Sequence, residues 1–153
     1  MIMKKIFFFL LLTQIGYGQV WKPFADRFVS PGVFDCINFN NQLYISGDYY
    51  GDSLNLSNVS RWDGNDWQPL ADGILGGVLT MTNYNGELYL GGRFLYINNV
   101  INARKIARWD GTSFFPLAKG ITSGGWVVAT ISYNGNLYVG GSFQTVDSLP
   151  IHT

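Results

Sequence analysis

A motif that occurs three times along the chain constrains the fold more than any other feature of the sequence. The pattern Leu-Tyr-x-x-Gly lies at residues 43–47, 88–92 and 137–141, at intervals of 45 and 49 residues. Two further landmarks return in the same order, an Arg-Trp-Asp-Gly segment and then a Pro-Leu-Ala segment. A period of about 40–50 residues indicates stacked copies of one supersecondary unit, because a single unit cannot bury its apolar face alone.

Each copy carries the pattern of four short β-strands. The first strand leads into an Asn-Asn or Asn-Gly pair, and Asn-Gly favours a type I′ hairpin because both central residues need a positive φ. The Leu-Tyr-x-x-Gly motif is the second strand. The first strands are predicted at 33–39, 78–84 and 127–133, the third at 58–62 and 105–109, and the fourth at 66–70 and 113–117. No sustained helical periodicity follows residue 18, so the sequence predicts an all-β chain.

A four-stranded antiparallel unit with this period is typical of a β-propeller blade. The prediction is a partial propeller: a fourth strand of a preceding or closing blade at 19–32, blade repeats at 33–77 and 78–126, and an incomplete repeat at 127–153, about two and three-quarter blades. Closed propellers have about 4–8 blades. Two interpretations follow. The chain is the N-terminal part of a longer protein, which the loop-like last residues favour, or it self-associates through unpaired blade edges.

The order of these landmarks resembles the Kelch-like propeller repeat. The similarity is greater to the Gly-Gly-x-Phe … Ile-Ala-x-Trp-Asp-Gly repeats of secreted surface proteins, which residues 91–94 and 106–111 match. Ser46 departs from the glycine pair, and Phe114 replaces a tryptophan. The resemblance implies structural roles for the repeated glycines, tryptophans and turn aspartates. These are Gly47, Gly91, Gly92, Gly140, Gly141, Trp62, Trp67, Trp109, Asp63 and Asp110.

The first residues have the layout of a secretory signal peptide. Lys4 and Lys5 precede an apolar run of seven residues, and Gly16 and Gly18 place small residues before a cleavage site after Gly18. The run is too short for a membrane-spanning helix, which needs about 20 apolar residues. The sequence therefore predicts that residues 1–18 are removed and that the protein is secreted or held at the cell surface.

Composition excludes several classes of protein. The chain is 47% hydrophobic and only 13% charged, which argues against a disordered chain. Ten basic and ten acidic residues leave no basic footprint for nucleic acid. One histidine and one cysteine argue against a disulfide framework or a transition-metal site, and no cofactor is expected. Cys36 occupies the repeat position of Met81 and Thr130, which predicts a small packing residue.

The variable loop between the second and third strands is the place to look for a site, because binding residues gather on loops held by a rigid scaffold. The predicted loops are residues 48–57, 93–104 and 142–152, and the candidate ligand-binding residues on them are Tyr49, Tyr50, Arg93 and Tyr96. Phe94, which is repeated as Phe143, is predicted to be a packing residue. Asp48 and Asp52 are candidate calcium ligands, since calcium takes carboxylate oxygens, with a solvated loop as the alternative.

These features favour a secreted, non-catalytic scaffold that binds or adheres to an extracellular protein or glycan. No catalytic residue is assigned. Two alternatives stay open, because propellers host many chemistries. One is the N-terminal fragment of an extracellular enzyme, of glycosidase or lyase type, whose acids lie in further blades. The other is a structural repeat fragment without an activity of its own.

Overall fold

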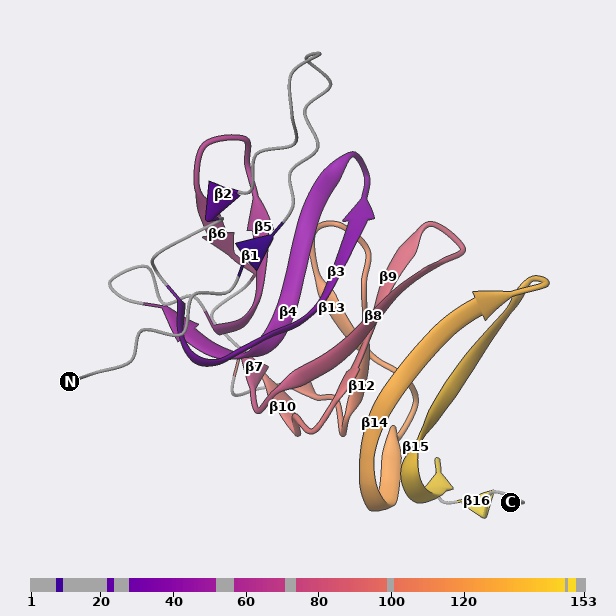
Figure 1. Cartoon of the computed structure of the whole chain (residues 1–153). Coiled ribbons are helices and arrows are strands. Elements are labelled where there is room, and N and C mark those ends of the chain that lie inside the picture. Colours follow the sequence, from indigo (N-terminus) through magenta and orange to yellow (C-terminus); the bar gives the residue numbers. More distant parts are fainter. Residues whose placement is uncertain are drawn as a thin grey trace.

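The computed structural model describes residues 8–9, 22–23, 28–51, 57–70, 74–98, 101–147 and 149–150. The regular secondary structure of these residues consists of β-strands alone, and all strand pairs are antiparallel (Figure 1). The all-β prediction is confirmed.

Three sheets carry most of the strands, and we number them along the chain. The first sheet has the order β3-β4-β5-β6, the second β8-β9-β12-β13 and the third β14-β15-β16. Their strands are β3 (Phe28–Phe39), β4 (Gln42–Gly51), β5 (Ser57–Trp62), β6 (Trp67–Pro69), β8 (Val78–Tyr84), β9 (Glu87–Gly92), β12 (Ile106–Trp109), β13 (Phe114–Pro116), β14 (Ile121–Tyr133), β15 (Asn136–Val146) and β16 (Leu149–Pro150). The hairpins β3–β4, β8–β9 and β14–β15 follow one another across the molecule (Figure 1).

Two smaller sheets complete the described structure. A three-stranded sheet joins β7 (Ile74–Leu75), β10 (Tyr96–Ile97) and β11 (Ile101–Asn102) in the order β11-β10-β7. The strands β1 (Phe8–Phe9) and β2 (Lys22–Pro23) pair with each other. β1 lies inside the predicted signal peptide and β2 inside the predicted strand 19–32. The proposed cleavage site lies outside the described residues, so export stays a prediction.

The three long hairpins close with the turns that the sequence predicts. Both central residues of each turn have a positive φ, as a type I′ turn requires. The values are 51° and 59° for Asn40 and Asn41, 52° and 78° for Asn85 and Gly86, and 48° and 73° for Asn134 and Gly135. Asparagine and glycine tolerate this conformation best, which explains why they occupy these places.

All three predicted loops are partly strand, and in two of them the second strand of the repeat simply continues. β4 continues through Asp48 to Gly51, and β15 continues through Ser142 to Val146. The reason is that β3 and β14 begin earlier than predicted and so provide longer partners, as the pairing of Asp48 with Gly32 shows. β9 stops at Gly92, and the chain after it pairs with β7 instead.

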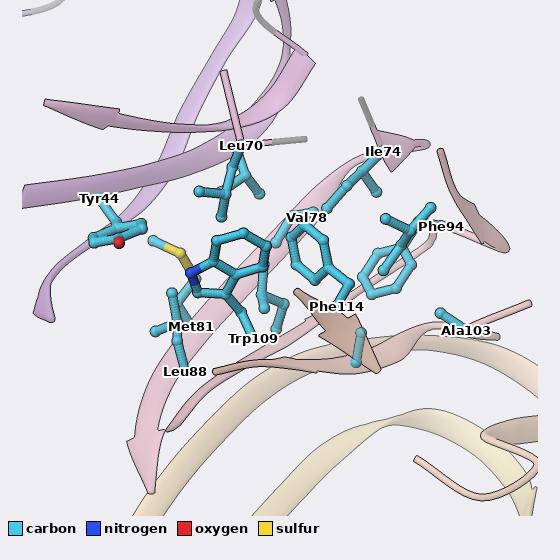
Figure 2. Packing of buried hydrophobic residues seen from close by; sticks show 14 of the residues in the cluster. Tyr44, Leu70, Ile74, Val78, Met81, Leu88, Phe94, Ala103, Trp109 and Phe114 are labelled. Carbon is cyan, nitrogen blue, oxygen red and sulfur yellow. The ribbon is translucent and has the colours of Figure 1, made fainter. Parts of the chain in front are cut away.

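The main core lies between the first and second sheets. Tyr44 and Leu70 of the first sheet face Met81, Leu88 and Trp109 of the second (Figure 2). A second cluster joins the second and third sheets, with Ile106, Ile121 and Val127 as its buried members. The apolar faces of the repeats are therefore buried where one sheet packs on the next. Such burial stabilises the fold by about 25 cal/mol for each Å² of apolar surface removed from water.

One hydrogen bond between sheets occurs twice, at equivalent positions. Asp35 Oδ2 accepts a bond of 2.6 Å from the backbone N–H of Met81, which joins β3 to β8. Thr80 Oγ1 accepts a bond of 3.1 Å from the backbone N–H of Thr130, which joins β8 to β14. The first strands of successive sheets therefore lie side by side in one repeated arrangement.

Candidate binding surface

The same irregularity interrupts the first strand of each sheet. The register shifts between Val33 and Asp35, between Val78 and Thr80, and between Val127 and Ala129. Each shift leaves one residue outside the regular pairing, as in a β-bulge, and bulges often re-aim a side chain beside a functional site. The residues concerned are Phe34, Leu79 and Val128. Phe34 and Val128 are half exposed and Leu79 is partly buried, so two of the three bulges present an apolar residue at the surface.

One arginine, Arg93, connects all three sheets. The Arg93 guanidinium forms an ion pair with the Asp48 carboxylate of the first sheet. It also lies 5.8 Å from the ring centroid of Trp126 in the third sheet, within cation–π range. The backbone N–H of Arg93 donates a 2.9 Å hydrogen bond to Gly77 O, which fixes the chain at this point. Trp126 is half exposed and lies two residues before Val128.

We call Phe34, Leu79, Arg93, Trp126 and Val128 the candidate binding surface. It offers apolar area, one aromatic face and one cation. An exposed ion pair such as that between Arg93 and Asp48 contributes only about 0–1 kcal/mol, so a ligand can displace it at small cost. These residues suit recognition, since they offer a ligand hydrogen-bond donors, an aromatic face and apolar area.

The repeated glycines let the strands approach one another closely. A side chain at the last glycine of each motif would overlap the backbone carbonyl oxygen of the residue two positions before the bulge residue. The pairs are Gly47 with Gly32, Gly92 with Gly77, and Gly141 with Trp126. Gly91 has a different neighbour, because a Cβ there would overlap a methyl group of Val127 in the third sheet. At Gly140 the nearest atom would be the Cβ of Ala129, at an ordinary 3.8 Å.

The tryptophans of the motif form cross-strand pairs in equivalent places. Trp62 and Trp67 have ring centroids 5.3 Å apart, and Trp109 and Phe114 have theirs 4.6 Å apart. Trp67, Trp109 and Phe114 are buried. Aromatic pairs at such distances stabilise a sheet beyond their buried area. Phe114 thus takes the place of a tryptophan in the same pair.

The turn aspartates organise the connection between the third and fourth strands. Asp63 Oδ1 accepts two hydrogen bonds of 2.8 Å from the backbone N–H groups two and three residues further along. Asp110 Oδ1 accepts the equivalent pair at 2.7 and 2.8 Å. These bonds hold the pKa of both carboxyl groups below its usual value. The arrangement is an Asx turn. The turn alone explains why an aspartate precedes glycine here, and a bound ligand is not needed to explain it.

Tyr49 is not the exposed aromatic residue that the sequence suggests. It is only 2% exposed, and its hydroxyl is hydrogen-bonded to Ile45 O at 3.2 Å and to Ser60 Oγ at 3.1 Å. Burial raises its pKa. Tyr49 occupies the repeat position of Phe94, which is fully buried as predicted. The alignment of Tyr49 with Phe94 therefore indicates that Tyr49 is buried, because a position that packs in one repeat tends to pack in the next.

The other candidate residues lie in different places. Arg93 belongs to the candidate binding surface, and Tyr96 is 40% exposed on β10. The backbone of Tyr50 lies in β4, but its side chain is outside the described residues, as is all of Asp52. Asp48 faces Arg93. Among the described residues no three His, Cys, Asp or Glu side chains gather as a metal site would require.

The prediction for Cys36 is wrong within this chain. Met81 and Thr130, at the equivalent positions, each lie against the preceding sheet, whereas Cys36 is exposed. Partial burial and the neighbouring Asp35 carboxylate raise the pKa of its thiol. Cys36 is exposed because it lies in the first sheet, and no sheet of the described stack precedes that sheet.

Phe34, Trp126 and Val128 were missed by sequence reasoning. For Phe34 and Val128 the signal is the apolar pair at the start of each predicted first strand, Val-Phe, Val-Leu and Val-Val, which breaks the alternation of a half-buried strand. An extra residue in a bulge produces such a pair.

None of the described residues forms a helix of the length and apolar character needed to cross a membrane. Comparison with protein-family models, with curated proteins and with solved structures finds no match to this chain.

Proposed function

We propose that this chain is a secreted or cell-surface repeat protein of the β-propeller type that acts as a non-catalytic scaffold for binding or adhesion. Three sheets with equivalent hairpins, stacked through equivalent residues, support the propeller arrangement. The resemblance of the motifs to Kelch-like repeats of secreted surface proteins points the same way. The three blades are the first, second and third sheets.

The observation that carries the binding role is the candidate binding surface. Arg93 contacts Asp48 of the first sheet and Trp126 of the third, and Phe34, Leu79 and Val128 occupy equivalent bulge positions in the three sheets. Tryptophan and arginine are the side chains that most often dominate the energy of protein interfaces, and aromatic faces also accept the apolar face of a sugar ring. The ligand is therefore an extracellular protein or a glycan.

The experiment uses the full chain against a glycan array and against immobilised extracellular-matrix proteins. We expect binding to one ligand class, weakened about tenfold or more by Trp126→Ala and by Arg93→Ala, since such residues contribute above about 1 kcal/mol when they are hot spots. Trp126 is half exposed, so its truncation leaves the buried core intact.

The second sheet provides a matched control with the same chemistry. Arg108 forms an ion pair with Glu87 and lies 4.3 Å over the ring centroid of Phe115, all within the second sheet. Arg108→Ala should leave binding unchanged. Equal loss of binding in the Arg93 and Arg108 variants would contradict the proposed surface. Turnover of a glycan by the unmodified chain would contradict a non-catalytic scaffold and favour the enzyme alternative.

A further inference from the structure

One face of the third sheet is open where the equivalent faces of the first two sheets are covered. Cross-strand pairing places six side-chain positions of β14 and β15 on this face. They are Ala129, Ile131, Tyr133, Asn136, Tyr138 and Gly140. Ile131 is 60% exposed, Tyr133 62% and Tyr138 51%. Three large apolar side chains in contact with water on one sheet face indicate an interaction surface.

The chain itself shows twice what covers such a face. In the first sheet the equivalent Phe39 and Tyr44 are 1% and 2% exposed, because they pack in one cluster with Val78 and Met81 of β8. In the second sheet the equivalent Thr82 is 8% exposed, and its hydroxyl donates a 2.9 Å hydrogen bond to a backbone carbonyl of β14. In both cases the cover is the first strand of another repeat.

Gly140 carries the clearest sign of a missing neighbour. Its equivalent in the second sheet is Gly91, where a methyl group of Val127 occupies the place of a side chain. At Gly140 the same place is open, with Ala129 Cβ 3.8 Å away. Its φ does not lie in the left-handed region, so its conformation does not require glycine. The glycine therefore keeps a space that matches a branched side chain such as valine.

The complementary strand lies at the other end of the same stack. Val33 of β3 is the repeat equivalent of Val78 and Val127, the two valines that are buried against a preceding sheet. Cys36, the equivalent of Met81 and Thr130, is exposed. Val33 is partly buried at the edge of a cluster that Ile45, Tyr49 and Trp67 form in its own sheet. One molecule thus carries both strands of the contact that it already makes twice internally.

We propose that the open face of the third sheet binds the β3 strand of a second copy of this chain, with Val33 of that copy filling the space at Gly140. The contact follows the valine-to-glycine packing of the second and third sheets. Ala129 takes the place of Asp35 and Thr80, so the new contact lacks the hydrogen bond that those two side chains accept. It is heterologous, so repetition closes a ring or extends a fibre. It depends on the stacking and not on the candidate binding surface, so a failed ligand test leaves it standing.

The first test is the mass of the full chain in solution as a function of concentration, by sedimentation or light scattering. We expect association for the unmodified chain and a monomer for Gly140→Leu, because the leucine side chain fills the space. Ile131→Arg, at an exposed position of the same face, should also be monomeric. Ser132→Leu is the control, since it adds the same leucine on the opposite face of β14 and should still associate. Circular dichroism verifies that each variant is folded.

Mixing separates this contact from non-specific adhesion. Cys36→Arg blocks the β3 side, so that variant should also be monomeric alone. A mixture of Cys36→Arg with Gly140→Leu should form a one-to-one dimer and nothing larger, because each variant keeps one intact surface. The Cys36 thiol should react more slowly with a thiol reagent as the unmodified chain is concentrated. An unmodified chain that is monomeric at every concentration, or association that survives both blocking substitutions, would overturn the proposal.

Discussion

At the scale of single residues, short polar side chains decide how the sheets and turns are joined. Asp35 and Thr80 link neighbouring sheets, Asp63 and Asp110 form the turns, and Asn58 joins the first sheet to β7. Each bond satisfies a backbone group that would otherwise lose its hydrogen bond to water on folding. Replacing one such side chain should therefore lower the free energy of unfolding by more than the small size of the side chain suggests.

Asn58 offers the sharpest test of this view. It is buried, its Oδ1 accepts a 3.0 Å hydrogen bond from the backbone N–H of Tyr49, and its Nδ2 donates a 2.6 Å bond to Ile74 O. Asn58→Gly removes both bonds but suits the φ of 62° at this position. We expect a loss of about 1–3 kcal/mol in the free energy of unfolding, measured with urea. Asn83→Ala, at an exposed position of β8, should change it by less than about 0.5 kcal/mol.

The turn aspartates predict how stability depends on pH. Hydrogen bonds from the backbone N–H groups three and two residues further along lower the pKa of Asp63 and of Asp110 in the folded state. The unfolded chain, with an ordinary aspartate pKa of about 3.9, takes up protons first as the pH falls. Their contribution is therefore complete above the unfolded pKa and is lost as the pH falls through the folded pKa.

The measurement is urea unfolding at neutral pH and at about pH 3, below the ordinary aspartate pKa. The double variant Asp63→Asn, Asp110→Asn keeps the Oδ1 acceptors and does not titrate, so it should lose less stability between the two pH values than the unmodified chain. Equal losses would show that these carboxyl groups contribute nothing to the acid response.

At the scale of elements, the sequence indicates hairpins well and bulges poorly. Asn-Gly fixes a turn through backbone conformation alone, so local residues suffice to predict it. The bulges at Phe34, Leu79 and Val128 depend on where the partner strand places its glycine, which local residues do not report. The burial of Tyr49 and the exposure of Cys36 likewise depend on which sheet lies next to them.

Gly91 and Gly140 form a matched pair for testing the stacking of the sheets. Gly91→Ala places a Cβ against Val127 of the third sheet, and such overpacking costs about 1–3 kcal/mol. Gly140→Ala meets only ordinary contacts and should leave the free energy of unfolding of the monomer unchanged or slightly raised. Urea unfolding at low protein concentration compares the two. Equal destabilisation would mean that the third sheet does not pack on the second as described.

At the scale of the whole molecule, the stack and the first eighteen residues make separate predictions. The stack predicts a binding surface that spans three sheets and an open face on the third sheet. The first eighteen residues predict export, because a short basic start, an apolar run and small residues are what a signal peptidase needs.

Export has a direct test. Expressed in a secreting host, the protein recovered outside the cell should begin at Gln19, as shown by intact mass and N-terminal sequencing. Gly18→Arg should leave the uncleaved chain of 17.1 kDa in the cell. A matching Gly64→Arg change, at an exposed turn far along the chain, should leave cleavage unaffected. Retention of residues 1–18 in the exported protein would contradict the prediction.

The bond from Asp35 to Met81, repeated from Thr80 to Thr130, has a consequence for how such a chain can change over time. Only the acceptor is a side chain, while the donor is a backbone N–H that every residue except proline supplies. The receiving strand is therefore free to vary, as methionine and threonine at the donor positions illustrate. A unit can be duplicated or exchanged with a diverged sequence and still attach to its neighbour, so the number of units is easier to alter than the way they are joined.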